Sequence, residues 1–174
     1  MIKLITFDLD NTLWNADPVL IKAEKVLYKW LQEHCPEMAS CYSIETMRDY
    51  KAAIATDNPA LLHRVSALRL EALRRAMLDA GYGECVAEQQ AKQAFDVFHA
   101  ARQQVTLFDH AGPLLKGLSQ RYQLAALTNG NADVSIIGLD CYFNFALSAD
   151  DIGRQKPHPD MFLAALERAE VRAN

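Results

Sequence analysis

Several features that define other protein classes are missing from this sequence of 174 residues. No apolar stretch is long enough to cross a membrane, and Asp8 interrupts the first apolar run before a signal-like segment could form. There are 18 basic and 22 acidic residues, so the net charge of −4 gives no reason to expect binding to nucleic acid or to an anionic membrane. We therefore expect a cytoplasmic protein whose partner is a small molecule, with no nucleic acid and no membrane among its partners.

The cysteine and histidine spacings of common metal sites and redox pairs are also missing. The four cysteines are scattered without a Cys-x-x-Cys spacing, and the five histidines show no His-x-x-x-His spacing. These absences argue against a zinc knuckle, a dithiol redox pair and a zinc hydrolase. We expect the cysteines to be reduced thiols, mostly in or near the core.

The apolar residues predict a core of alternating strands and helices. Hydrophobic residues make up 51% of the chain, which is ample for one packed core with a small inserted lobe. Short apolar runs at 2–7, 124–127 and 143–147 predict strands, and the first of these is expected to be buried. Strands that alternate with helices predict a Rossmann-like parallel α/β core with right-handed crossovers.

A long helical block separates the first two predicted strands. Apolar residues recur at helical spacing from about 17 to about 104, and Pro36 is expected to end the first helix of the block. The block is too long for an ordinary crossover, so it is predicted to be an inserted helical domain above the strand ends, where a lid would sit. We accordingly assign residues 1–16 and 105–174 to the α/β core and 17–104 to the helical domain.

Two carboxylates follow the first predicted strand. Asp8 and Asp10 are two positions apart, so on an extended chain both point to the same side. Like charges this close repel by roughly 4 kcal/mol at an effective dielectric of 20, which calls for a divalent metal or a lysine beside them. Taken alone, the pair is also compatible with ordinary loop carboxylates, with Asn11 and Thr12 making turn hydrogen bonds.

Two later segments end the second and third predicted strands in a comparable way. The polar groups of Thr128–Gly130 (TNG) would face the same carboxyl edge as Asp8, where ligands bind in open α/β sheets, and Gly130 permits a tight turn there. Lys156, followed by a proline, precedes the last predicted helix. Each segment alone is equally typical of a turn or of a solvated lysine, so their shared order is the informative feature.

The three segments together resemble the haloacid dehalogenase (HAD) superfamily of hydrolases. Phe7–Leu13 (FDLDNTL) matches the first signature of that family, hydrophobic-Asp-x-Asp-x-Thr-Leu/Val, and Thr128–Gly130 and Lys156 stand where the second and third signatures would. The acid at position 10 favours the phosphatase branch, because an ester leaving group needs a proton and a halide does not. The resemblance implies a type I helical cap and Mg²⁺-dependent hydrolysis of a small phosphorylated metabolite.

Residue roles follow from the resemblance position by position. It implies that Asp8 is the nucleophile that forms an aspartyl-phosphate and that Asp10 is first the general acid and then the base. Lys156 would balance the negative charge, and Asp8 with the main-chain carbonyl of Asp10 would bind Mg²⁺. The phosphate-binding residues implied in this way are Thr128, Asn129 and Gly130.

The fourth signature of the family, an acidic pair or Asp-x-x-x-Asp after another strand, is not found after Lys156. Glu167 and Glu170 fit a solvated helix face better than a metal site. We therefore expect a core that is truncated at its C-terminus relative to the family, with weakened Mg²⁺ binding and impaired activity.

Several functional alternatives stay open. The chain is also similar to bacterial phosphatases that act on flavin mononucleotide (FMN) and on the ribitylaminouracil phosphate of riboflavin synthesis. The same core could instead serve a phosphomutase, a phosphonate hydrolase or a dehalogenase, and the missing acid leaves room for a binding module without catalysis. Trp14, Asn15 and Asp17 are candidate substrate contacts, although packing explains Trp14 equally well.

Overall fold

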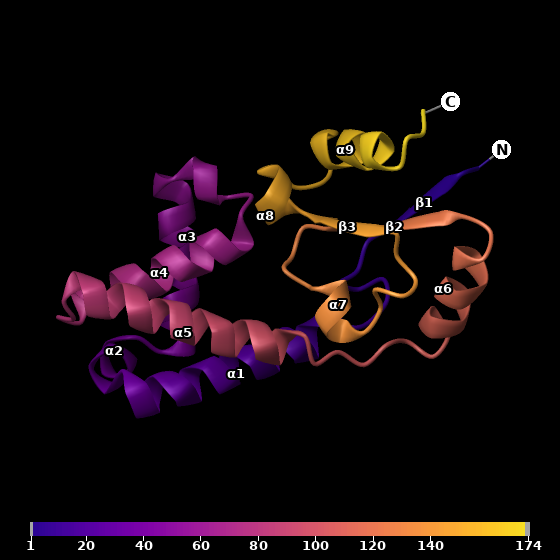
Figure 1. Ribbon diagram of the computed structural model, residues 1–174. Coiled ribbons are helices and arrows are strands. Elements are labelled where there is room, and N and C mark those ends of the chain that lie inside the picture. The colour runs from indigo at the N-terminus through magenta and orange to yellow at the C-terminus, as the bar shows by residue number, and fades with distance from the viewer. Residues whose placement is uncertain (1, 173–174) are drawn as a thin grey trace. The chain divides into compact units, whose positions relative to one another are not determined.

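The computed structural model describes residues 2–172. Within them the chain forms two compact units, whose elements are labelled in Figure 1. The α/β unit contains the described residues up to Ala16 and from Gln103 onward, and the helical unit contains Asp17–Arg102. Among the described residues, no helix combines the length and apolar character needed to cross a bilayer.

A three-stranded parallel sheet forms the centre of the α/β unit, with strand order β1-β2-β3. Phe7 lies opposite Ala126, and Thr128 lies opposite Ser148, so the carboxyl ends of the three strands lie along one edge. This topology confirms the predicted parallel α/β core. The strands are β1 (Leu4–Phe7), β2 (Gln123–Thr128) and β3 (Phe145–Ser148).

Burial in the sheet is concentrated on its middle strand. Every residue of β2 after Gln123 is buried. β1 is only half-buried and its Thr6 is exposed, so the expectation of a buried first strand was wrong. The reason is the strand order, because among the described strands β1 pairs with β2 alone.

Helices pack on the sheet and build its core. α9 (Asp160–Arg168) contacts β2 and β3, and α6 (Ala111–Ser119) contacts β2; Figure 1 shows the two helices on opposite sides of the sheet. Met161 and Ala165 of α9 form a buried cluster with Leu127 and Leu147. Leu127 of β2 and Leu147 of β3 therefore belong to the face of the sheet that α9 covers.

Two short helices follow the second and third strands, α8 directly and α7 after the loop 129–133. α7 (Val134–Ile137) is capped by Asp133, as predicted, because its side chain accepts hydrogen bonds from the main chain of the first turn. α8 (Ala149–Ile152) lies where the sequence predicted only a polar loop. Ser148 and Asp151 form a reciprocal capping box there, which stabilises a turn of helix too short to show periodicity.

The helical unit contains no strand within the part of the chain that the structure describes, as the sequence predicted. α4 and α5 lie alongside one another (Figure 1), and small alanine side chains from α5 allow close packing in a buried cluster with residues of α1, α2 and α4. The elements of this unit are α1 (Ala16–His34), α2 (Pro36–Cys41), α3 (Ile44–Asp57), η1 (Pro59–Leu61), α4 (Val65–Asp79) and α5 (Glu84–Arg102).

Two expectations for the helical unit and the cysteines need correction. Pro36 does end the first helix, but it also begins α2, because a proline suits the first turn of a helix. Of the four cysteines only Cys35 is buried, whereas Cys41, Cys85 and Cys141 are exposed. The three exposed cysteines lie at or just beyond helix ends, where apolar periodicity no longer places a side chain in the core.

Replacing the buried Leu124 of β2 should destabilise the α/β unit. Leu124 is 0% exposed, so Leu124→Ala removes buried methyl groups and leaves a cavity, which should lower the free energy of unfolding by about 2–5 kcal/mol. Leu163→Ala is the matched control, because that leucine on α9 is 60% exposed and its truncation should cost less than about 1 kcal/mol. Urea denaturation followed by circular dichroism measures both, and equal losses would contradict the assigned core.

Candidate active site

A lysine and an aspartate that are far apart in sequence meet at the carboxyl edge of the sheet. The Lys156 ammonium donates a hydrogen bond to Oδ1 of Asp8 at 2.7 Å and another to the main-chain carbonyl of Leu127. The lysine side chain is 16% exposed and the aspartate side chain 44%. The cation thus lies beneath a carboxylate that solutes can still reach.

The sheet geometry explains why these residues meet. Asp8 continues the alternation of Leu4 and Thr6, and Leu4 packs against the cluster that includes α9. One residue beyond the Phe7–Ala126 pair, the register brings Asp8 next to Leu127. Lys156 precedes α9, which covers this face of the sheet. The carboxylate of Asp8 and the ammonium of Lys156 therefore lie on the same face.

Asn129 fixes the main chain of Lys156 from both sides. Its Oδ1 accepts a hydrogen bond from the Lys156 main-chain N–H at 2.7 Å, and its Nδ2 donates to the Lys156 carbonyl at 3.0 Å. The two bonds together resemble the pairing between strands, and they hold the lysine-bearing segment to the end of β2. The side chain that was expected to bind phosphate therefore also positions Lys156.

The loop after β2 is held by a buried threonine and a buried glutamine. Thr128 is 2% exposed, and its Oγ1 accepts a hydrogen bond from the Gly130 main-chain N–H at 3.0 Å. Gln103 donates to the Asn131 carbonyl at 3.0 Å and accepts from the Asp133 N–H at 2.9 Å. Nothing in the sequence singled out Gln103, because a lone glutamine outside any motif gives no signal.

The indole of Trp14 fixes one oxygen of Asp10. Trp14 is completely buried, and its Nε1–H donates to Oδ1 of Asp10 at 2.9 Å. The burial of Trp14 fits the expectation that this side chain packs in the protein. The sequence did not predict its hydrogen bond to Asp10. An indole nitrogen is only a donor, so the bond specifies an acceptor at this oxygen of the carboxyl group.

Turn hydrogen bonds complete the loop that follows β1. Asn11 adopts a positive φ of 60°, which asparagine tolerates better than most residues, and its Oδ1 accepts a hydrogen bond from the Ala16 N–H at 2.9 Å. The Thr12 hydroxyl lies 3.3 Å from Oδ2 of Asp8. Asn11 and Thr12 therefore make the expected turn bonds, and they do so around an acid that Lys156 also contacts.

The oxygen donors near Asp8 fit magnesium in their chemistry. Mg²⁺ prefers oxygen ligands and in enzymes commonly keeps several waters while binding one or two carboxylates and the substrate phosphate. A carboxylate at Asp8 and a carbonyl at Asp10 are donors of this kind. Within residues 2–172, no three His, Cys, Asp or Glu side chains come together to hold a metal.

Comparisons with known proteins identify the family of this chain. The family model for haloacid dehalogenase-like hydrolases matches residues 2–174. The *Escherichia coli* K12 protein described as 5-amino-6-(5-phospho-D-ribitylamino)uracil phosphatase YigB is 34% identical over 170 residues, which cover 98% of this chain and 71% of YigB. This chain is therefore a hydrolase, and it belongs to the haloacid dehalogenase-like family.

Solved structures share the fold. A crystal structure described as 2-haloacid dehalogenase from *Pseudomonas syringae* pv. tomato DC3000 is 44% identical, with a TM-score of 0.94 and coverage of 100% of this chain and 75% of that one. The L-2-haloacid dehalogenase of *Xanthobacter autotrophicus* is 23% identical, with a TM-score of 0.57 and coverage of 100% and 67%. The second similarity supports the fold alone, and the family and Rossmann-like fold predicted from the sequence are both confirmed.

Removing the Asn129 side chain should loosen the segment that carries Lys156. Asn129→Ala deletes both hydrogen bonds to the Lys156 main chain, so the Lys156 amide should exchange with solvent at least about tenfold faster, as expected for a loss of 1–3 kcal/mol. Arg154→Ala, at an exposed position in the same segment, is the control and should leave that rate unchanged. Amide hydrogen exchange followed by NMR measures the effect, and unchanged protection in Asn129→Ala would contradict it.

Proposed function

We propose that this chain hydrolyses small phosphate monoesters through a covalent aspartyl-phosphate at Asp8. The observation that carries the proposal is the contact of the Lys156 ammonium with Asp8 at the carboxyl edge of the sheet. The cation stabilises an ionised carboxylate, which is the form that can act as a nucleophile. It also lies where negative charge would gather on a phosphoryl group bound to that carboxylate.

In the first half of the proposed reaction, an Asp8 carboxylate oxygen attacks phosphorus. A bond forms between that oxygen and phosphorus while the bond from phosphorus to the ester oxygen breaks. The departing alkoxide takes a proton from Asp10 and leaves as an alcohol. Because the Trp14 N–H already donates to Oδ1 of Asp10, the transferable proton is expected on Oδ2.

In the second half, Asp10 acts as a base. It takes a proton from a water molecule as the water oxygen attacks phosphorus, the bond to Asp8 breaks, and inorganic phosphate is released with Asp8 restored. Asp10 is then protonated again, so the two steps return the site to its starting state. One residue thus serves as acid and base in turn, which requires the fixed position that Trp14 supports.

The neighbouring polar groups are proposed to bind the phosphoryl oxygens. Thr128 accepts from Gly130 N–H, so its own hydroxyl proton can be directed to a phosphoryl oxygen. The main-chain N–H of Asn129 is proposed as a further donor, whereas the Gly130 N–H is already bonded to Thr128. Lys156 is proposed to neutralise charge. Mg²⁺ bound by Asp8 and the Asp10 carbonyl would supply additional charge stabilisation.

The substrate class is proposed from the curated relative. YigB is described as acting on a phosphorylated ribitylamino compound, and it is similar over 98% of this chain. We propose that this chain acts on phosphate esters of comparable size, with FMN as a practical test substrate. The helical unit is proposed to be the type I cap that selects among such substrates, in line with the expected domain boundaries.

Dehalogenation is the second candidate, because a structure 44% identical to this chain is described as a 2-haloacid dehalogenase. In that reaction the same carboxylate would attack carbon and displace halide. A halide leaves without a proton, so Asp10 would have no role as a general acid in that reaction. We therefore favour phosphate esters, and the two functions are separated by the product released.

Replacing the nucleophile should abolish phosphate release. Asp8→Asn removes the carboxylate and the ion pair with Lys156, so kcat for p-nitrophenyl phosphate and for FMN with Mg²⁺ should fall by roughly 10³-fold or more. Asp140→Asn is the control, because this aspartate is exposed in the same unit and should leave kcat unchanged. Inorganic phosphate is measured for the esters and chloride for 2-chloropropionate.

The products decide between the candidates. Phosphate release that depends on Asp8 supports the phosphatase, whereas chloride release that depends on Asp8 would replace it by the dehalogenase. Activity toward either ester that survives Asp8→Asn would contradict the covalent mechanism itself.

Replacing Asp10 should slow hydrolysis most for esters with poor leaving groups. Asp10→Asn keeps the shape of the side chain but cannot donate a carboxylic proton, so hydrolysis of FMN, which releases an alkoxide, should fall by about 10²–10⁴-fold. Formation of the aspartyl-phosphate from p-nitrophenyl phosphate should fall less, because nitrophenolate departs without protonation. Single-turnover kinetics with both substrates tests this, and equal losses in the first step would argue against a general acid at Asp10.

A further inference from the structure

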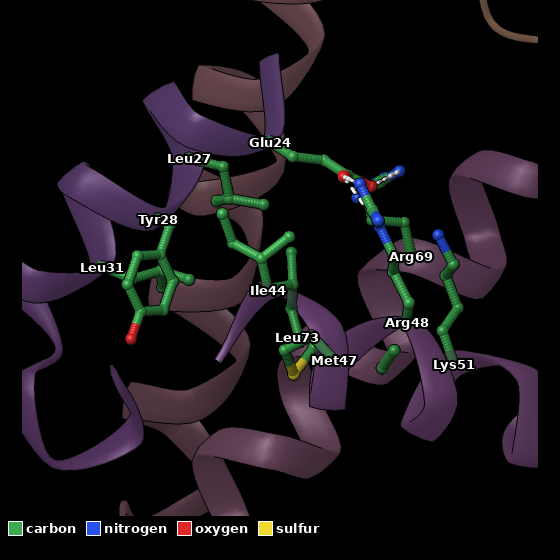
Figure 2. Close-up of a pocket in the computed structure, with 11 residues that line it drawn as sticks. Glu24, Leu27, Tyr28, Leu31, Ile44, Met47, Arg48, Lys51, Arg69 and Leu73 are labelled. Carbon is green, nitrogen blue, oxygen red and sulfur yellow. Dashed lines mark hydrogen bonds and ion pairs between the residues drawn. The ribbon is translucent and has the colours of Figure 1, made fainter. Parts of the chain in front are cut away.

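The helical unit has a pocket of its own, lined by residues of α1, α3 and α4 (Figure 2). It is open to solvent, and the empty space in and above it, open solvent included, is about 430 Å³. Figure 2 shows that its charged and apolar side chains are segregated, with Glu24, Arg48, Lys51 and Arg69 on one side of the view. The pocket thus has a charged end and an apolar end.

Two arginines share the carboxylate of Glu24 at the charged end of the pocket. Glu24 accepts hydrogen bonds from the Arg48 guanidinium, and a nitrogen of Arg69 lies 3.9 Å from its other oxygen. Arg69 is largely buried, with its guanidinium carbon 3.6 Å from the centre of the Phe98 ring. With Lys51 included, the four side chains carry a formal charge of +2.

Lys51 is the cation without a carboxylate at hydrogen-bonding distance. Within the part of the chain that the structure describes, no acid lies within ion-pair distance of its ammonium, although Glu24 is near enough to act on it electrostatically. Burial, with the positive charges of Arg69 and Arg48, lowers the pKa of Lys51 to about 8, and Glu24 opposes the shift. Such a group gains from an anion placed beside it.

Apolar side chains line the rest of the pocket. Figure 2 shows Tyr28 and Ile44 away from Lys51, and the Tyr28 hydroxyl is directed out of the apolar lining by its hydrogen bond to the Ala39 carbonyl at 3.0 Å. The remaining apolar lining is aliphatic except for the thioether of Met47. It consists of Leu27, Leu31, Met47, Ala72 and Leu73.

We propose that this pocket is a binding site for a small organic anion, in which a carboxylate, sulfonate or phosphate group lies against Lys51 and Arg48 and an apolar or aromatic body lies against Ile44 and Met47. The excess of two positive charges selects the sign of the ligand. The apolar end selects against inorganic ions, since burial of its surface requires a ligand with a hydrocarbon part. The observations that carry this proposal all lie within the helical unit.

The pH dependence of binding follows from the groups that face Lys51. These are Glu24 from α1, Arg48 from α3 and Arg69 from α4. The bound anion interacts with protonated Lys51, so affinity is full below pH 8 and falls as the pH rises through about 8. Arg69, whose pKa is lowered by burial to about 10, stays charged over the same range.

Titration of the whole chain with benzenesulfonate tests the proposal, because this probe joins an aromatic ring to a charge that does not change with pH. In ¹³C-methyl NMR the Met47 methyl should shift saturably, whereas Met161, buried in the α/β unit, should not. Lys51→Met should raise the dissociation constant about tenfold or more at pH 7 and remove its pH dependence near 8. Lys25→Gln, at an exposed position on α1, is the control and should bind as the unmodified chain does.

Methyl phenyl sulfone is similar in size to benzenesulfonate but has no charge. It should bind at least tenfold more weakly than benzenesulfonate. If Lys51→Met perturbs the fold of the helical unit, as the methyl of the buried Met77 would reveal, Arg48→Gln at the more exposed cation replaces it with the same expected loss of affinity. The proposal is overturned if Met47 does not shift, if the neutral sulfone binds equally well, or if the folded variants retain full affinity. Because the readout is binding, it is independent of any failure to hydrolyse phosphate esters.

Discussion

The contact that organises the α/β unit is the Lys156 ammonium, shared between the Asp8 carboxylate and the Leu127 carbonyl. It connects the end of β1, the end of β2 and the segment that precedes α9. A buried cation needs such partners, because an uncompensated charge out of water is costly. The position of the proposed nucleophile is therefore set by the same contact that satisfies the lysine.

Hydrogen bonds from side chains to the main chain hold the surrounding loops. Asn129 holds the Lys156 segment, Gln103 holds the loop after β2, and Asn11 holds the start of α1. These polar side chains bind the backbone where regular secondary structure ends and main-chain groups need other partners. The loops are thus fixed by partly buried groups, while Asp8 keeps an exposed side chain that a substrate can reach.

The helical unit arranges charge in a different way. Arg48 and Arg69 pair with Glu24, Lys51 lies in the same pocket, and the surplus of positive charge adjoins apolar side chains rather than a strand end. The cluster carries more positive charge than Glu24 alone can balance. A ligand that brings both an anion and apolar surface would satisfy the two ends of the pocket at once, which is the physical basis for the site proposed in this unit.

The sequence by itself determined the family and the parallel core, and the family resemblance implied that Lys156 lies beside Asp8. Ordered motifs at strand ends converge on one edge of a parallel sheet. Only the tertiary structure decided the exposure of β1, the capped turn of α8 and the bonds that Gln103 makes. These features depend on strand neighbours, on local capping geometry and on contacts between distant residues, none of which leaves a periodic signal. Lys51 is the clearest case, since its place beside Arg69 and Glu24 arises from the packing of three helices.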